Sequence, residues 1–172
     1  MIVEPQEWLP DEVIVRHCTY RNTGRFGIYL KSSNCLIEDS LFEGNAGGLR
    51  IGGEWWPKCG WLESTHPRNV TVRRCTFRQN RLDMRFGGCR YDTAIAIEAG
   101  YDMTLPGLMR DIRIHDNTFE NEGTCLSAKN CDGVWFWNNR IKNCERVMAV
   151  DPATARNVSA SKPLDHDTLA PS

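Results

Sequence analysis

The chain has 172 residues with 21 Lys and Arg against 22 Asp and Glu, a formal net charge of −1, which suits one soluble domain of ordinary size. The balanced charge gives no indication of nucleic acid as a partner. No run approaches the roughly 18 apolar residues of a membrane-spanning helix, so a membrane is not expected as a partner either.

One residue frame recurs along the chain and predicts its secondary structure. The frame is an apolar residue, any residue, an apolar residue, two further residues, a small Cys, Ser or Asn, any residue, an aromatic residue or Ile, and an Asn shortly afterwards. It occurs at residues 13–22, 35–45, 70–80, 112–121 and 134–143. Apolar side chains at alternate positions are typical of β-strands, because successive side chains point to opposite faces. We therefore expect two short strands in each unit.

A third short apolar segment follows each unit, at residues 27–30, 48–51, 94–97, 125–128 and 147–150. Two of the intervals between units are 22 residues long, and the longer intervals carry insertions, which we place at 53–68, 81–92 and 98–110. The sequence thus predicts an all-β fold, a right-handed parallel β-helix (a solenoid) of about five three-stranded coils over residues 1–150. A β-sandwich is the alternative, but it does not explain identical frames at a fixed coil length.

Equivalent residues of successive coils should stack in columns that form the core. One column starts each unit, a second is aromatic, and a third, small and polar, lies at the bend between strands, where Asn amides can hydrogen-bond from coil to coil. The three columns are Val13, Cys35, Val70, Ile112 and Val134; Tyr20, Phe42, Phe77, Phe119 and Ile141; and Cys18, Ser40, Cys75, Asn117 and Asn139.

The two ends of the chain differ from the repeat. After Val150 the composition is rich in Pro, Ala, Ser and Asp, so we interpret 151–172 as a C-terminal cap and flexible tail. A β-helix exposes unpaired strand edges unless they are covered, and only a short segment precedes the first coil. We therefore expect upstream coils of a longer parent chain as a partner.

The eight cysteines occur singly, without a Cys-x-x-Cys pair or a Cys/His cluster at zinc spacing, so neither a metal nor another cofactor is predicted. Cys18, Cys35 and Cys75 fall at inward positions and are expected to be free buried thiols. Cys59 and Cys89, in insertions, are the candidates for a disulfide.

The insertion at 53–68 is the leading candidate for a binding site, because solenoids usually place function in their outer wall and insertions. Trp61 and Glu63 are the first substrate-contact candidates, followed by Trp55, Trp56 and Glu54. Indole faces stack on the apolar faces of sugar rings, while carboxylates bind sugar hydroxyls. The alternative is that the three tryptophans only pin the loop to the wall of the helix.

Two further groups of side chains lie on the predicted exterior. Acids of the later insertions should emerge from the same edge, where some can converge with Glu54 and Glu63 as the carboxylate pair that glycoside hydrolysis requires. On the first strand of the last coil, Trp135 and Trp137 are predicted to face outward. They are expected to face solvent there, and the alternative is that a further domain or subunit covers them. The acids are Asp83, Asp92, Glu98 and Asp102.

The repeats resemble the right-handed, pectate-lyase-like β-helix superfamily. More narrowly, the order of features resembles the C-terminal coils of glycoside hydrolase family 110, the α-1,3-galactosidases. The stretches that carry the resemblance are Cys18-Thr19-Tyr20-Arg21-Asn22, Cys35-Leu36-Ile37-Glu38, Trp61-Leu62-Glu63-Ser64 running into Asn69-Val70-Thr71-Val72, and residues 111–119.

This resemblance implies part of a carbohydrate-active protein, a glycoside hydrolase that acts on oligosaccharide or polysaccharide. The family is expected to use adjacent aspartates in an Asp-Asp-x-Ile-Asn segment, and this sequence has no Asp-Asp. The catalytic acids are therefore expected outside this chain, and the isolated chain is not expected to be active. The residues after Met1 do not predict a signal peptide, although a parent enzyme of this kind is expected to be secreted or periplasmic. A non-catalytic sugar-binding or adhesin solenoid is the alternative function.

Overall fold

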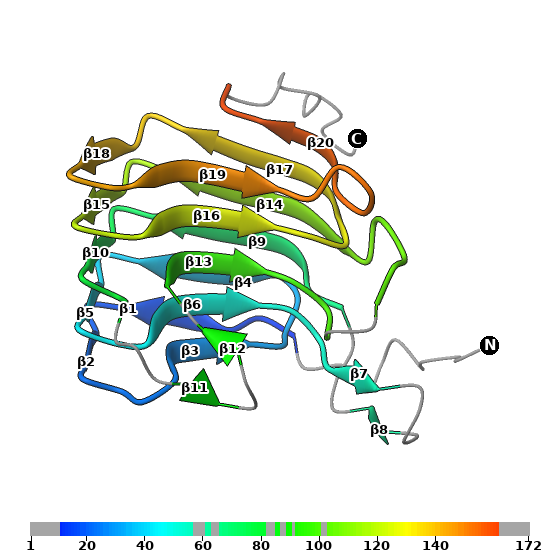
Figure 1. The fold of residues 1–172 in the computed structure, drawn as a ribbon, viewed down its shortest axis with the longest axis horizontal. Coiled ribbons are helices and arrows are strands. Elements are labelled where there is room, and N and C mark those ends of the chain that lie inside the picture. Colours follow the sequence, from blue (N-terminus) through cyan, green and yellow to red (C-terminus); the bar gives the residue numbers. More distant parts are fainter. Residues whose placement is uncertain are drawn as a thin grey trace, which may run out of the picture.

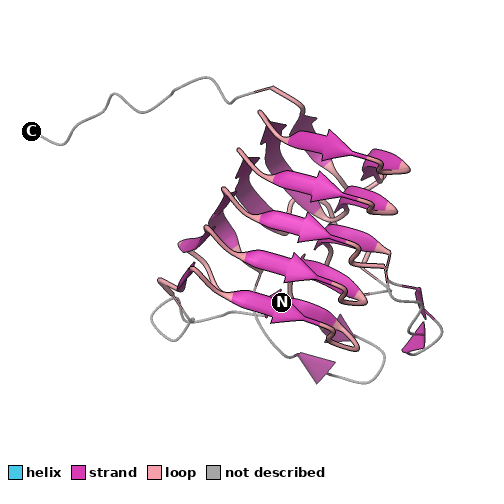
Figure 2. Ribbon diagram, turned by 90° about the vertical axis from the view of Figure 1, so that its left-hand side faces the viewer, coloured by secondary structure: helices cyan, strands magenta, loops and turns pink. Residues whose placement is uncertain are grey.

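The computed structural model describes residues 11–56, 61–62, 66–81, 85–86, 89–90, 92–100 and 103–161. Its strands form three parallel sheets around one core, and the described residues contain no helix (Figure 1). Figure 2 shows the strands of successive coils lying one above another. The predicted three-stranded parallel β-helix is confirmed.

The first sheet holds the strand that opens each coil. Cys35 pairs with Val70, Val70 with Ile112, and Ile112 with Val134, all on parallel strands, so the predicted column is in register. The strands in spatial order are β1 (Ile14–Arg16), β4 (Cys35–Glu38), β9 (Arg68–Arg73), β14 (Met109–His115), β17 (Cys131–Trp137) and β20 (Arg156–Ser159).

The second sheet carries the aromatic column. Ring centroids of Tyr20 and Phe42 lie 5.1 Å apart, those of Phe42 and Phe77 4.8 Å, and those of Phe77 and Phe119 5.1 Å, close to the spacing of neighbouring strands. The three Phe side chains are completely buried. The strands are β2 (Thr19–Arg21), β5 (Leu41–Glu43), β10 (Thr76–Arg78), β15 (Thr118–Glu120) and β18 (Arg140–Lys142).

The third sheet completes each coil, and two antiparallel hairpins extend from insertions. The inward side chains of this sheet, such as Leu49, Ile95 and Leu126, are completely buried. Its strands are β3 (Phe26–Leu30), β6 (Gly47–Ile51), β13 (Thr93–Ile97), β16 (Thr124–Ala128) and β19 (Arg146–Val150); the hairpins are β7 (Trp55–Trp56) with β8 (Trp61–Leu62), and β11 (Arg85–Phe86) with β12 (Cys89–Arg90).

The asparagines that close the repeated frame belong to two different columns, not one. Asn22, Asn121 and Asn143 have a left-handed backbone, with φ between 53° and 56°. Asn45 and Asn80 lie one residue further along the coil and are buried in the interior. Asn suits both places, because it tolerates the left-handed conformation and its amide can also bridge neighbouring coils.

The first sheet extends beyond Val150, where the repeated frame ends. Strand β20 pairs in parallel with β17, and Val158 is in register with Val134. The chain turns from β19 back to the first sheet at Asp151, whose carbonyl accepts hydrogen bonds from the amides of Thr154 and Ala155. Within β20, Val158 alone continues an apolar column, so the sequence gives little indication of this strand. Residues 162–172, part of the predicted tail, lie outside the described residues.

The predicted free thiols agree with the structure. Cys18, Cys35 and Cys75 are free, Cys35 and Cys75 are buried, and Cys18 is partly buried. Burial raises the pKa of the Cys75 thiol to about 11. The bridge suggested for Cys59 and Cys89 lies outside the side chains that the structure describes. Within the described residues, no helix is long and apolar enough to cross a membrane.

Candidate functional site

The tryptophan-rich insertion forms a hairpin at one edge of the third sheet. Strand β7 pairs with β8, Trp55 opposite Leu62 and Trp56 opposite Trp61, and the hairpin extends away from the stacked coils (Figure 1). The backbone of Trp55, Trp56 and Trp61 is thereby placed beside the end of β6. Their side chains, and Glu63 as a whole, lie outside what the structure describes, so their contacts with a substrate stay predictions.

Two carboxylates from different coils meet at one buried arginine beside this hairpin. Arg50 lies on β6 with only 1% of its side chain exposed. Its Nη1 lies 2.9 Å from Glu54 Oε1, and its Nε lies 3.2 Å from Glu98 Oε1. Glu54 and Glu98, which belong to separate insertions, thus both contact the same guanidinium. Both carboxylates remain partly exposed, at 14% and 21% of the side chain.

Aromatic rings surround the guanidinium of Arg50. Its Cζ lies 4.5 Å from the ring centroid of Tyr29 and 5.7 Å from that of Phe26. Lys31 Nζ lies 4.3 Å from the Tyr29 centroid. Such cation–π contacts are strongest where water is excluded, so they help to hold a charged side chain against the outer face of the sheet.

Tyr29 adds a neutral hydroxyl to the cluster. Burial raises the pKa of this phenol; Arg50 opposes the shift, and the neighbouring carboxylates of Glu54 and Glu98 add to it. The hydroxyl is buried, and the Glu54 carboxylate beside it contributes to the raised pKa. Tyr29 therefore stays protonated over the ordinary pH range and can donate a hydrogen bond.

The close approach of the two coils at this point depends on Gly52. A Cβ atom at residue 52 would lie 1.9 Å from the backbone oxygen of Glu98, which excludes any side chain there without movement of the backbone. The amide of Gly52 donates to the carbonyl of Leu30, and the amide of Glu98 donates to that of Ile51. Gly52 thus lets the coil that carries Glu54 pack tightly under the coil that carries Glu98.

Glu98 also lines a cavity of about 290 Å³ at the carboxyl ends of the third-sheet strands. Lys129 and Asp151, the residues that follow β16 and β19, lie in the same lining. The amide of Ala153, the hydroxyl of Thr154 and, more weakly, Lys129 lower the pKa of Asp151. The lining of the cavity thus includes one lysine and two acidic residues, and it adjoins the Arg50 cluster through Glu98.

Buried Asn130 holds the wall of this cavity in place. Its Nδ2 donates to the carbonyls of Met103, at 2.8 Å, and Leu105, at 3.0 Å. Its backbone amide donates to the hydroxyl of Thr154. These bonds tie the insertion that follows β13 to the turn before β20. The cavity is close to the smallest ligand pockets, which measure about 300 Å³.

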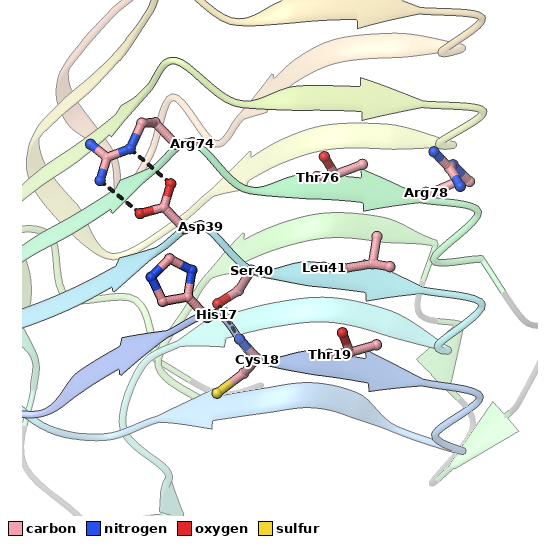
Figure 3. A pocket seen from close by; sticks show the side chains of 9 residues that line it. All are labelled: His17, Cys18, Thr19, Asp39, Ser40, Leu41, Arg74, Thr76 and Arg78. Carbon is pink, nitrogen blue, oxygen red and sulfur yellow. Dashed lines mark hydrogen bonds and ion pairs between the residues drawn. The ribbon is translucent and has the colours of Figure 1, made fainter.

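A second, shallower groove of about 580 Å³ crosses the second sheet (Figure 3). Outward side chains such as Thr76 form its floor, and Arg74 and Arg78 lie at its two sides. Arg74 makes two 2.8 Å bonds with the Asp39 carboxylate, while Arg78 pairs with acids of the neighbouring coils. The groove is open and its arginines are partly exposed, whereas Arg50 is buried and Glu98 lines a more enclosed cavity, so the Arg50 cluster is the stronger candidate site.

Sequence reasoning identified Glu54 and named Glu98 among several acids, but it missed Arg50, Tyr29 and Lys129. A signal was present in β6, where Arg50 interrupts the run Gly-Gly-Leu-Arg-Ile at an outward position. An arginine in a strand that is otherwise apolar suggests a paired charge. Glu54 is close in sequence, but Glu98 could not be recognised as a partner, because it lies one coil and two insertions away.

Comparison with known proteins bears on the fold. The model of a family described as "right handed beta helix region" matches residues 10–147. A search of curated proteins finds no match.

Proposed function

The chain belongs to the right-handed β-helix family, and on this fold we propose that it binds carbohydrate at the edge of the third sheet where Glu54 and Glu98 meet Arg50. The observation that carries the proposal is this convergence of two partly exposed carboxylates on one buried guanidinium. The carboxylates supply acceptors for sugar hydroxyls, and Arg50 holds them in place. The adjoining hairpin contributes three tryptophans, whose rings are suited to stacking on sugars.

The arrangement supports binding better than acid–base catalysis within this chain. A glycosidase needs one carboxyl group that carries a proton for the leaving oxygen. Glu54 and Glu98 instead both contact one guanidinium, in an arrangement suited to two hydrogen-bond acceptors. Hydrolysis by an α-1,3-galactosidase-like parent is therefore proposed to use acids outside this chain, in keeping with the lack of an Asp-Asp pair in the sequence.

A panel of neutral oligosaccharides, including α-1,3-linked galactosides, tests the proposal by isothermal titration calorimetry. We expect at least one sugar to bind, and Glu54→Gln and Glu98→Gln each to raise its dissociation constant about tenfold or more, because each loses charge-assisted hydrogen bonds. Trp61→Ala should weaken binding by a similar factor if its indole stacks on the sugar.

The matched control is Glu145→Gln, because Glu145 is 65% exposed and pairs with Arg81, away from the Arg50 cluster. It should leave the dissociation constant unchanged. An equal loss of affinity in this control, or no heat from any sugar, would contradict the proposal and favour a purely structural solenoid. A parallel assay for reducing-sugar release should show no hydrolysis by the isolated chain.

A further inference from the structure

Trp135 and Trp137 lie on the outer face of the first sheet, on a different wall from the Arg50 cluster. Both belong to β17 and are only partly buried, whereas Phe136 between them points into the core. Side chains two residues apart in a strand share one face and lie about 6.6 Å apart along it. The two side chains therefore leave the same face of β17, and the ring of Trp135 lies over Gly133 of that strand.

One side of each indole is supported by the preceding coil. His115, in register with Trp137, stacks on it with ring centroids 4.3 Å apart and planes 18° apart. Arg113, in register with Trp135, places its Cζ 5.8 Å from that ring. These contacts fix both rings as rigid surfaces whose planes face along the axis of the β-helix.

The supporting side chains are themselves held by polar partners. Arg113 Nη1 donates to Asn69 Oδ1 at 3.0 Å, and His115 Nδ1 lies 2.6 Å from Asp116 Oδ2. The polar groups beneath the tryptophans are thus held by hydrogen bonds within the protein, and Arg113 is held by a neutral amide.

The opposite side of Trp135 faces strand β20, the last strand of the first sheet in the described part of the chain. The residue in register there is Ser159. A serine side chain is too short to cover an indole ring. Its hydroxyl lies 2.6 Å from that of Ser161, so within the described part of the chain two hydroxyl groups border this side of the ring.

We propose that Trp135 and Trp137 form a second ligand site, a platform on which an uncharged pyranose ring stacks, with the hydroxyl of Ser159 as its hydrogen-bond partner. A pyranose has an apolar face of C–H groups and a rim of hydroxyls, which match an indole bordered by serines. The neutral hydroxyl groups of Ser159 and Ser161 beside the ring suit an uncharged ligand that carries hydroxyls. The proposal concerns another wall of the molecule and does not rest on the function of the Arg50 cluster.

Titration of ¹⁵N-labelled protein with neutral gluco-, manno- and galacto-oligosaccharides tests the platform, with the indole N–H resonances as the readout. At least one sugar should shift the signals of Trp135 and Trp137. Trp135→Ala should weaken that sugar's binding about tenfold, because the stacking surface is lost. Ser159→Phe should abolish binding while the protein stays folded, because the phenyl ring would stack on Trp135 in place of the sugar.

Glu54→Gln is the control that separates the two sites, and it should leave the shifts of Trp135 and Trp137 unchanged. The proposal is overturned if no sugar in the panel moves these signals, or if Ser159→Phe binds as well as the original chain. It is also overturned if sedimentation shows self-association that Trp135→Ala abolishes, because the face would then be an interface between copies of the chain.

Discussion

Glu122 is a completely buried carboxyl group at the end of an interior ladder of side-chain hydrogen bonds. The Asn45 amide donates to Asn80 Oδ1, and Asn80 in turn donates to both carboxyl oxygens of Glu122, from its side chain at 2.9 Å and its backbone amide at 3.0 Å. Burial raises the pKa of Glu122 from 4.5 to about 7, although the bonds from Asn80 oppose the shift. The folded protein therefore holds this proton more tightly than the unfolded chain.

This pKa shift predicts that the carboxyl group lowers stability as pH rises. Its stabilising contribution is complete below the unfolded pKa of 4.5 and is lost as the pH passes the folded value of about 7. Between pH 5 and pH 8 the free energy of unfolding should fall by about 2–3 kcal/mol from this group alone. Glu122→Gln should remove that part of the dependence, because its amide has no proton to lose in this range.

Urea denaturation of both proteins at pH 5 and pH 8 measures the effect. The advantage of Glu122→Gln should be larger at pH 8 than at pH 5. Glu145→Gln, at an exposed position, controls for the loss of one negative charge. Its free energy of unfolding should match that of the original chain at both pH 5 and pH 8. An unchanged pH dependence in Glu122→Gln would show that Glu122 does not titrate in this window.

At the scale of the strands, polar side chains at the bend between the first and second sheets join one coil to the next. The hydroxyl of Ser40 accepts from the amide of Cys18, Asn117 Oδ1 accepts from that of Cys75, and Asn139 Oδ1 accepts from that of Asn117. Asn117 Nδ2 also donates to the carbonyl of Val72. The side chains thus satisfy buried backbone groups where the chain bends out of the regular ladder.

Asn117→Ala should lower the free energy of unfolding by about 2–4 kcal/mol, because it leaves the buried amide of Cys75 and carbonyl of Val72 without their partner. Asn117→Ser should cost less, since serine in the same column accepts the equivalent bond at Ser40. Chemical denaturation of the three proteins measures both differences. Equal stability of the alanine and serine variants would argue against the hydrogen-bond explanation.

Over the whole molecule, burial decreases from the middle coils towards both ends. Val70 and Ile112 are completely buried, whereas Val13 and Val158 are only partly buried. Each coil of a solenoid contacts its neighbours alone, so an end coil gains packing from one side only. The end strands β1 and β20 should therefore open more readily than the central strands β9 and β14.

Hydrogen exchange followed by mass spectrometry should find the strongest protection in β9 and β14 and the weakest in β1 and β20. Two substitutions in one column provide a matched pair. Val70→Ala should lower the free energy of unfolding by about 2 kcal/mol, and Val158→Ala should lower it clearly less, because only the substitution at Val70 leaves an enclosed cavity. Uniform protection of all strands, or equal costs of the two substitutions, would show that the coils unfold as one unit.

The sequence by itself determined the coil, because the alternation within a strand and the return after 22 residues are repeated in the residues themselves. It placed Val13 through Val134 in one column and Tyr20 through Ile141 in another, as the register confirms. It did not reveal β20, because Val158 alone continues the pattern there, and it merged two columns of asparagine that lie one residue apart.

Only the tertiary structure decided which polar residues meet. Glu54 and Glu98 are separated by two insertions of irregular length, so no spacing in the sequence places them on Arg50. Their meeting depends on how closely two coils pack at Gly52 and on the direction in which each insertion leaves its strand. Periodicity is a local property of the chain and can be read from it, whereas contacts between insertions form only when the coils are stacked.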